Sequence, residues 1–213
     1  MKKIPDETIG RLFYYLRALV CLEKEGIDIV RSSRLSEICD INPSIIRKDL
    51  SYFGDFGKRG VGYNVSELKK EIRKILNIAE PNSMALIGVG NIGKAMLSFS
   101  GFRSEGFRIT MAFDKDQRKI GSKIKQVIVD DIANLEKKIQ SENIQLVILT
   151  VPEKEAPELA KRLAKAGVRA ILSFAPCQLK MPTNIKVTCI DLSSEIARLI
   201  YYSTKFESID LKK

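Results

Sequence analysis

The chain has 213 residues, of which 36 are Lys or Arg and 26 are Asp or Glu, so its formal net charge is +10. Hydrophobic residues make up 45% of the sequence, which excludes a chain that is disordered throughout. The excess positive charge is +3 over residues 1–80 and +7 over residues 81–213. Because no single segment concentrates it, net charge alone is a weak argument for a nucleic-acid partner.

The sequence also argues against membrane and secretory classes. No apolar run approaches the roughly 20 residues that span a bilayer, and the opening MKKIPDETIG lacks the apolar centre of a signal peptide. Cys21, Cys39, Cys177 and Cys189 are scattered without C-x-x-C spacing. We interpret them as reduced thiols of a cytoplasmic protein, not as a disulfide framework or a metal site.

Two helices are predicted first. In PDETIGRLFYYLRALVCLEKEG, apolar residues recur at every third or fourth position, and Gly26 ends the helix. SSRLSEICD then predicts a short helix, capped by Ser32 or Ser33, with Leu35 and Ile38 facing inward.

A third helix follows the turn INPS. Pro43 suits its first turn, and Ile46, Leu50 and Phe53 share one side of PSIIRKDLSYF. Two short helices joined by a tight turn predict a helix-turn-helix.

The opposite side of this third helix displays Ser44, Arg47, Lys48 and Ser51. Arginine pairs with guanine edges in the major groove of DNA, and lysine and serine suit phosphates or bases. The alternative is an ordinary amphipathic helix with a solvated basic face.

The next stretch, SYFGDFGKRGVGY, holds four glycines among four aromatic residues. Its glycines favour tight turns, so we predict a β-hairpin wing that presents Lys58 and Arg59 to a phosphate backbone or minor groove. A surface loop with chance charges is the alternative. SELKKEIRKILN then predicts a closing helix whose inward residues are Leu68, Ile72, Ile75 and Leu76. This helix completes the order of a winged helix.

A glycine-rich loop follows the linker EPNS. A buried strand, Met84 to Ile87, leads into G-x-G-x-x-G and then a helix, which is the context of a dinucleotide-binding loop. The first glycine makes the turn, the second lets a pyrophosphate touch the backbone, and the third allows close packing of helix on strand. The helix N-terminus favours phosphates. The predicted loop comprises Gly88, Val89, Gly90, Asn91, Ile92 and Gly93.

A second strand, FRITMAFD, ends at Asp114, about twenty residues after the loop. A carboxylate there binds ribose hydroxyls and repels a 2′-phosphate, which favours NAD over NADP, although Lys115 and Arg118 weaken this preference. The alternative is a glycine turn in an α/β domain that holds no ligand.

Strands and helices continue to alternate up to the strand IKVTCID, which predicts a doubly wound parallel sheet. Ligands bind at the carboxyl ends of such strands, so two loops are expected to line the nicotinamide side. Ordinary loop packing is the alternative. These loops are Thr150, Val151, Pro152 and Phe174, Ala175, Pro176.

A last helix, LSSEIARLIYYSTKF, carries more apolar surface than a helix at a chain end usually keeps, and it docks either on its own sheet or on a partner subunit. Dehydrogenases need a proton donor or acceptor, commonly His, Lys or Tyr, and this chain has no histidine. It also lacks a second domain large enough for a substrate site. We therefore expect a sensor of the dinucleotide and not an enzyme.

The motif RKDLSYFGDFGKRGVGYNV resembles the signature of the Rex family of redox-sensing transcriptional repressors, and ALIGVGNIGKAML, AFD, VILTVP and SFAP resemble its cofactor domain in the same order. The resemblance covers the chain to about Asp191. It implies an α/β homodimer in which NADH releases operator DNA. The implied parts are a winged-helix DNA-binding domain (1–79), a Rossmann-like NAD(H)-binding domain (80–191) and a C-terminal dimerisation helix exchanged between subunits (192–213).

One position departs from the family. Where many members have a tyrosine, this chain has Phe99. The resemblance implies that such a tyrosine joins a polar link with an aspartate matching Asp191 and an arginine matching Arg17, and Phe99 has no hydroxyl with which to join it. An oxidoreductase and a CoA-binding protein remain the alternative functions.

Overall fold

The computed structural model describes residues 4–58 and 60–210, and the side chains of the last helix up to Ser203. The chain forms two compact units, Met1–Pro81 and Asn82–Lys213. The three-part division at residues 79 and 191 stays a prediction.

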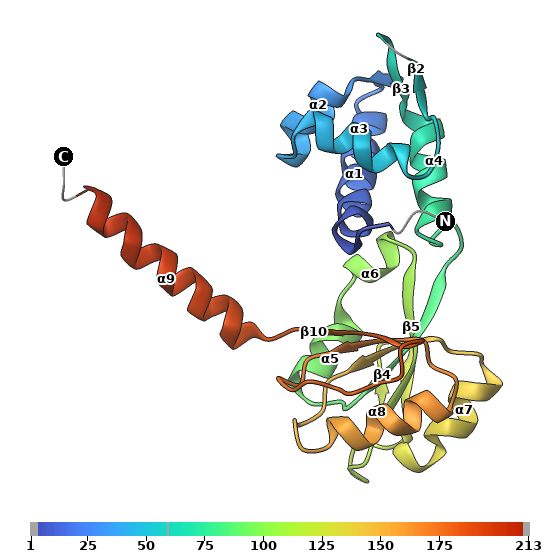
Figure 1. Cartoon of the computed structure of the whole chain (residues 1–213). Coiled ribbons are helices and arrows are strands. Elements are labelled where there is room, and N and C mark those ends of the chain that lie inside the picture. Colours follow the sequence, from blue (N-terminus) through green and yellow to red (C-terminus); the bar gives the residue numbers. More distant parts are fainter. Residues whose placement is uncertain (1–3, 59, 211–213) are drawn as a thin grey trace. The chain divides into compact units, whose positions relative to one another are not determined.

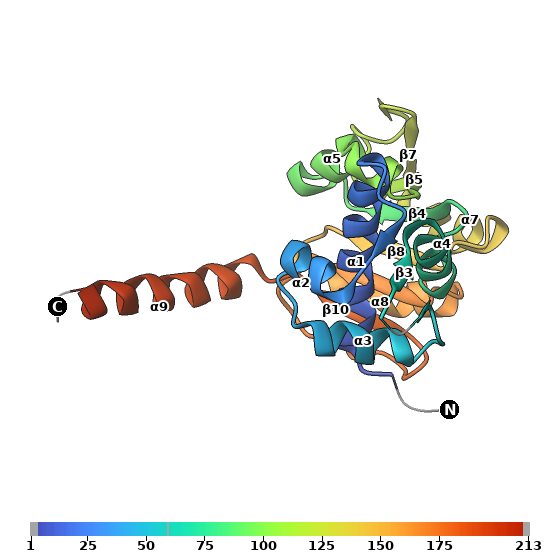
Figure 2. The ribbon, with the colours of Figure 1, turned by 90° about the horizontal axis from the view of Figure 1, so that it is seen from above.

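The first unit combines helices with a small sheet. In it, α1 runs through the middle, with α2 and α3 on one side and α4 on the other (Figure 1, Figure 2). Apolar side chains of α1, among them Leu12 and Leu16, form its core with Ile46 and Leu68. The described elements are α1 (Asp6–Lys24), β1 (Ile29–Val30), α2 (Ser32–Cys39), α3 (Pro43–Ser51), β2 (Gly57–Lys58), β3 (Gly62–Asn64) and α4 (Val65–Ile75).

Local signals set the ends of these helices. Gly26, with φ of +74°, follows α1. The Asn42 side chain accepts a hydrogen bond from the Ser44 amide (2.9 Å) at the start of α3, and Asn64 caps α4 in the same way.

The predicted hairpin is present. β2 and β3 pair antiparallel, and β3 also pairs with β1, which gives the sheet order β1-β3-β2. Gly62 has φ of +122°, and a Cβ there would lie 2.5 Å from the carbonyl oxygen of Val30. The close pairing of β3 with the preceding segment therefore requires glycine, and the described elements follow the order of a winged helix.

Several details of this unit differ from the sequence prediction. Ile38, which was expected to face inward, is 41% exposed. The helix α2 is short, and Leu35 is its one fully buried residue. The cap position of α2 is Arg31, and Ser32 is already helical. Phe53 lies beyond α3 and is half-buried.

The second unit is a seven-stranded sheet in the order β10-β9-β8-β4-β5-β7-β6, parallel except for the antiparallel pair β6 and β7. The strand β4 (Asn82–Ile87) lies between β8 (Leu146–Leu149) and β5 (Phe107–Asp114). The remaining strands are β6 (Lys123–Ile124), β7 (Val127–Asp131), β9 (Ala170–Ser173) and β10 (Lys186–Cys189).

Helices cover both faces of this sheet (Figure 1). Alternate residues of β4 point to opposite sides, so Ala85 and Ile87 pack with α7 and α8, while Met84 and Leu86 pack on the side of α5 and α6. The helices are α5 (Asn91–Ser98), α6 (Gly101–Ser104), the 3₁₀ turn η1 (Ile132–Asn134), α7 (Leu135–Ser141) and α8 (Ala156–Lys165). This is the predicted doubly wound α/β arrangement.

The last helix, α9 (Leu192–Asp210), is exposed along the part whose side chains are described. Leu192, Ile196 and Leu199 are each more than half exposed. In the described part of the chain, no helix is both long and apolar enough to cross a membrane.

Candidate functional site

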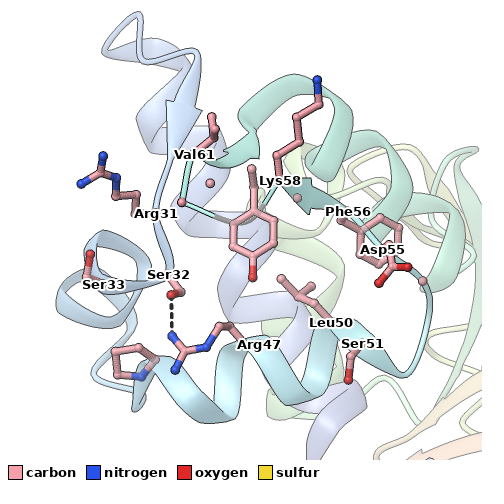
Figure 3. Close-up of a pocket in the computed structure, with 16 residues that line it drawn as sticks. Arg31, Ser32, Ser33, Arg47, Leu50, Ser51, Asp55, Phe56, Lys58 and Val61 are labelled. Atoms are coloured by element: carbon pink, nitrogen blue, oxygen red, sulfur yellow. Dashed lines mark hydrogen bonds between the residues drawn. The ribbon is translucent and has the colours of Figure 1, made fainter.

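A cavity of about 700 Å³ lies in the first unit between α3 and the hairpin. Its wall contains Arg31, Arg47 and Lys58, together with Ser51 and Tyr63. Figure 3 shows Arg47 reaching from α3 to Ser32 at the start of α2, where Arg47 Nη1 donates to Ser32 Oγ (2.9 Å). Arg47 of α3, Lys58 of β2 and Arg31 of the segment before α2 therefore line one concave surface.

The side of α3 away from this surface is fixed to α1 through the buried carboxylate of Asp49. Arg11 donates to it from Nε (2.6 Å) and from Nη2 (2.8 Å), the Tyr15 hydroxyl donates at 2.7 Å, and Thr8 Oγ1 donates at 2.9 Å. Burial by itself raises the pKa of Asp49, but the hydrogen bonds from Arg11, Tyr15 and Thr8 outweigh it and hold that pKa below its usual value.

The structure places the residues predicted to contact DNA on one helix and its neighbouring hairpin. Ser44, Arg47, Lys48 and Ser51 are all exposed on α3, but only Arg47 and Ser51 of these line the cavity. Lys58 lines it from the hairpin, and Arg59 lies outside the described residues.

Arg31 was missed by the sequence prediction. It is exposed and lines the same cavity from the segment before α2. The signal in the sequence is a basic residue directly before the two serines of SSRLSEICD, at the predicted start of a helix.

In the second unit, the glycine loop follows β4. The chain continues to β5 on one side of β4 and later returns to β8 on its other side, so the loop lies where the strand order reverses. Gly88 has φ of +91°, and a Cβ there would lie 2.6 Å from the Thr150 carbonyl oxygen. A Cβ on Gly93 would lie 2.2 Å from the Gly88 carbonyl oxygen, so α5 and the loop pack too closely at this position for any side chain. Gly90, by contrast, has open space in front of it.

Asp114 joins the end of β5 to this loop. Its Oδ2 accepts hydrogen bonds from the Val89 amide (2.7 Å) and from Lys119 Nζ (2.9 Å), and its Oδ1 accepts from the Asp116 amide (2.9 Å). Burial raises the pKa of Asp114, but these three donors outweigh burial and lower that pKa, so the group is a carboxylate at neutral pH.

A cavity of about 290 Å³ opens beside the loop. Thr150, Val151 and Pro152, at the end of β8, line it together with Gly88, Gly90 and Asp114. Across it, Lys115 Nζ pairs with Glu155 Oε1 at 2.7 Å.

The other predicted cofactor residues do not line this cavity. Phe174 packs against the apolar core on the α5 side, Ala175 is buried, and Pro176 is exposed. Val89 is buried behind the loop, whereas Asn91 and Ile92 are exposed in the first turn of α5.

The three residues predicted to couple the switch lie on separate elements. Arg17 of α1 stacks over the ring of Phe13 at 4.8 Å. Phe99 follows α5, is 56% exposed, and packs edge-on against Phe102. Asp191 caps α9 by accepting hydrogen bonds at Oδ1 from the amides of Ser193 (3.0 Å) and Ser194.

The loop geometry fits the pyrophosphate of a dinucleotide. An open approach at Gly90, amides at the start of α5 and a carboxylate at the end of the next strand are the parts that such a ligand requires. Among the described residues, no three His, Cys, Asp or Glu side chains are grouped as metal ligands.

Two family models match the chain. "Putative DNA-binding protein N-terminus" matches residues 3–51, and "CoA binding domain" matches residues 79–177.

The chain is also similar over its whole length to solved structures of RSP, described as a Rex-family repressor. The complex of RSP with β-NAD+ and operator DNA is 34% identical, with a TM-score of 0.91, over 99% of this chain and 97% of that chain. The complex with β-NADH is 33% identical, with a TM-score of 0.87, over all of both chains.

Curated relatives agree with these structures. The redox-sensing transcriptional repressor Rex of Desulforamulus reducens is 40% identical over 93% of this chain and 95% of its own length. The Rex protein of Carboxydothermus hydrogenoformans is 42% identical over 93% of this chain and 96% of its own length. These relatives are repressors, which confirms the expectation that the chain is not an enzyme. The chain belongs to the Rex family of redox-sensing transcriptional repressors.

Proposed function

We propose that this chain is a transcriptional repressor that binds operator DNA as a dimer through its first unit and releases the DNA when NADH occupies its second unit. The observation that carries this proposal is that one chain holds both a winged helix with a cationic concave face and a glycine loop open at Gly90. RSP, which is similar along its whole length, has been crystallised with operator DNA and with either form of the dinucleotide.

In the DNA complex, α3 enters the major groove. Arg47 and Lys48 reach base edges or phosphates, and Ser44 and Ser51 contact the backbone at either end of the helix. The hydrogen bond that Arg47 donates to Ser32 fixes one edge of the Arg47 guanidinium and leaves other N–H groups for a guanine. Lys58 of the hairpin contacts phosphates beside the helix, and the sequence predicts the same contact for Arg59.

In the cofactor complex, the pyrophosphate lies over Gly90 and the first turn of α5. A carboxylate has about four acceptor positions, and three of those on Asp114 are occupied by Val89, Asp116 and Lys119. The remaining position accepts a ribose hydroxyl. Lys119 therefore holds Asp114 in place without preventing it from recognising the ribose.

The nicotinamide end is expected to lie beside Thr150, Val151 and Pro152, which line the cavity. The oxidised ring is positively charged and the reduced ring is neutral. Because burial of an unpaired charge is costly, an apolar surface that includes Val151 favours NADH over NAD+.

The exposed apolar residues of α9 support a dimer in which this helix packs on the partner subunit. Large apolar side chains at this density are rarely left in water, and a two-fold dimer places two recognition helices on neighbouring turns of DNA. In this proposal, residues 1–79 read DNA, residues 80–191 bind NAD(H), residues 192–213 hold the dimer together, and the protein acts in the cytoplasm, where the DNA is.

The first experiment selects duplexes that bind the purified protein from a random-sequence pool. We expect a two-fold symmetric site whose half-sites are one or more helical turns apart, and calorimetry is expected to show NADH binding to the same preparation. Turnover of a metabolite with NADH, without selective DNA binding, would favour an oxidoreductase instead.

A further inference from the structure

Two of the four cysteines meet in the second unit. Cys177 lies four residues after the end of β9, and Cys189 is the last residue of β10. The Cys189 thiol donates a hydrogen bond to the backbone carbonyl of Cys177, with 3.3 Å between sulfur and oxygen. Because a carbonyl oxygen lies about 2.4 Å from its own Cα, the Cys189 sulfur is within about 6 Å of the Cys177 Cα.

The sheet holds the two cysteines at this distance. β9 and β10 are parallel neighbours, with Cys189 beside Ser173, and the Ile190 amide donates to the Ser173 carbonyl (2.7 Å). After β9 the chain turns back on itself, and the Cys177 amide donates to the Ala175 carbonyl (2.8 Å). Both cysteines therefore lie at the carboxyl edge of the sheet, with the Cys189 sulfur 3.3 Å from the Cys177 backbone, and this proximity is what a disulfide between them requires.

Both thiols are free, and they differ in surroundings. Cys189 is exposed, whereas Cys177 is partly buried against the apolar core beneath β8 and β9. Burial, followed by the nearby carboxylate of Glu153, raises the pKa of the Cys177 thiol. Cys189 is thus the more accessible nucleophile, and Cys177 is placed to react second.

We propose that Cys177 and Cys189 form an intrachain disulfide when the protein meets a peroxide, and that this disulfide is a second redox input to the repressor. The Cys189 thiolate attacks one oxygen of the peroxide, the O–O bond breaks, and a sulfenic acid forms as hydroxide leaves. The Cys177 thiolate then attacks that sulfur, the S–S bond forms, and the S–O bond breaks with loss of a second hydroxide. Two thiols are oxidised, one hydrogen peroxide is reduced, and the thiol protons complete two waters.

The consequence for regulation rests on the proposed function. Asp191 lies two residues after Cys189 and caps α9, so a disulfide would tie the start of α9 to the loop after β9. The segment that leads into the helix would lose freedom to move when NADH binds. We expect the oxidised protein to need at least about tenfold more NADH to release operator DNA than the reduced protein does.

The test treats the reduced full-length protein with hydrogen peroxide, blocks remaining thiols, and maps peptides by mass spectrometry without reduction. We expect a Cys177–Cys189 linked peptide that a dithiol reductant removes. Cys189→Ser should abolish it, and Cys177→Ser should leave a sulfenic acid on Cys189 that dimedone traps. Cys21→Ser and Cys39→Ser are the matched controls, and both should still form the link.

The same oxidised samples are then titrated with NADH on operator DNA. Absence of the linked peptide, a link to Cys21 or Cys39, or a link between subunits would overturn the proposal, as would a linked protein with an unchanged NADH response. The peptide map requires neither DNA nor NADH. Failure of the reduced protein to respond to NADH would therefore count against the proposed function and not against the cysteine pair.

Discussion

Arg11 on α1 and Asp49 on α3 form a two-pronged ion pair across the core of the first unit, with Nε and Nη2 2.6 and 2.8 Å from the carboxylate oxygens. Asp49 is 1% exposed and lies only two residues from Arg47, but on the opposite side of the helix. The pair therefore sets the rotation of α3 about its axis, and with it the direction in which Arg47 and Lys48 point.

Asp49→Asn removes the charge that Arg11 and Tyr15 share, and we expect a loss of about 3 kcal/mol of stability in the first unit at pH 7. The pKa of Asp49 is lowered by folding, so its contribution is present above its unfolded pKa of about 4 and is lost as the pH falls through the folded pKa. The difference between the two proteins should therefore shrink as the pH falls below the unfolded pKa. Urea unfolding, with peptides of α1 and α3 followed by hydrogen exchange, measures it.

The control is Glu37→Gln, which breaks a surface pair with Arg34 in which both side chains are more than half exposed. Such an exposed pair contributes little to stability, because water screens it. Equal losses in the two variants would mean that the buried network does not hold α3 in place.

Arg47→Ala and Lys58→Ala separate base reading from phosphate contact. Loss of Arg47 is expected to cost about 1–3 kcal/mol of operator affinity and to relax the base preference, whereas loss of Lys58 should weaken all sequences alike and lower the salt slope by about one. Fluorescence anisotropy at several salt concentrations measures both. Lys70→Ala, an exposed position on α4, is the control. Full operator affinity in folded Arg47→Ala protein would remove this residue from the interface.

Gly90→Val tests the glycine loop without damage to the fold. Gly90 has φ of −81°, which valine adopts, and its Cβ meets nothing within 4 Å, so only a ligand is obstructed. NADH binding measured by calorimetry should be lost, while operator binding is retained. Gly10→Val on α1 also faces open space, and it should bind NADH as the wild type does. Normal NADH affinity in Gly90→Val would mean that the pyrophosphate lies elsewhere.

Asp191→Asn tests coupling between cofactor and DNA. An asparagine still caps α9, so the variant removes only the negative charge that the resemblance to the family predicts to pair with Arg17, without removing the start of the helix. We expect normal NADH binding with a weaker effect of NADH on operator release. Operator release at the wild-type NADH concentration in Asp191→Asn would place the coupling at other residues.

Removal of the chain from Leu192 onward should yield monomers, as measured by light scattering, and these monomers should have poor operator affinity.

The sequence predicted the elements that are defined by residues within the element or directly beside it. The hairpin followed from its glycines, and the loop of residues 88–93 followed from its strand and helix flanks; Gly62 and Gly88 show why, since a Cβ at either position would overlap backbone. It could not show that Asp49 and Asp114 collect their hydrogen bonds from residues up to 41 positions away, because periodicity reveals burial but not partners. The short strands β1 and β6 were missed for the same reason, since only their pairing partners define them.

The most direct test of the account is the operator complex of the purified full-length protein titrated with NADH and, separately, with NAD+. Operator occupancy is followed by anisotropy at fixed salt, and Gly90→Val serves as the control that cannot bind the cofactor. We expect NADH to release wild-type protein from DNA at concentrations at which NAD+ does not, and Gly90→Val to stay bound throughout. Equal effects of NADH and NAD+, or release of Gly90→Val by NADH, would contradict it.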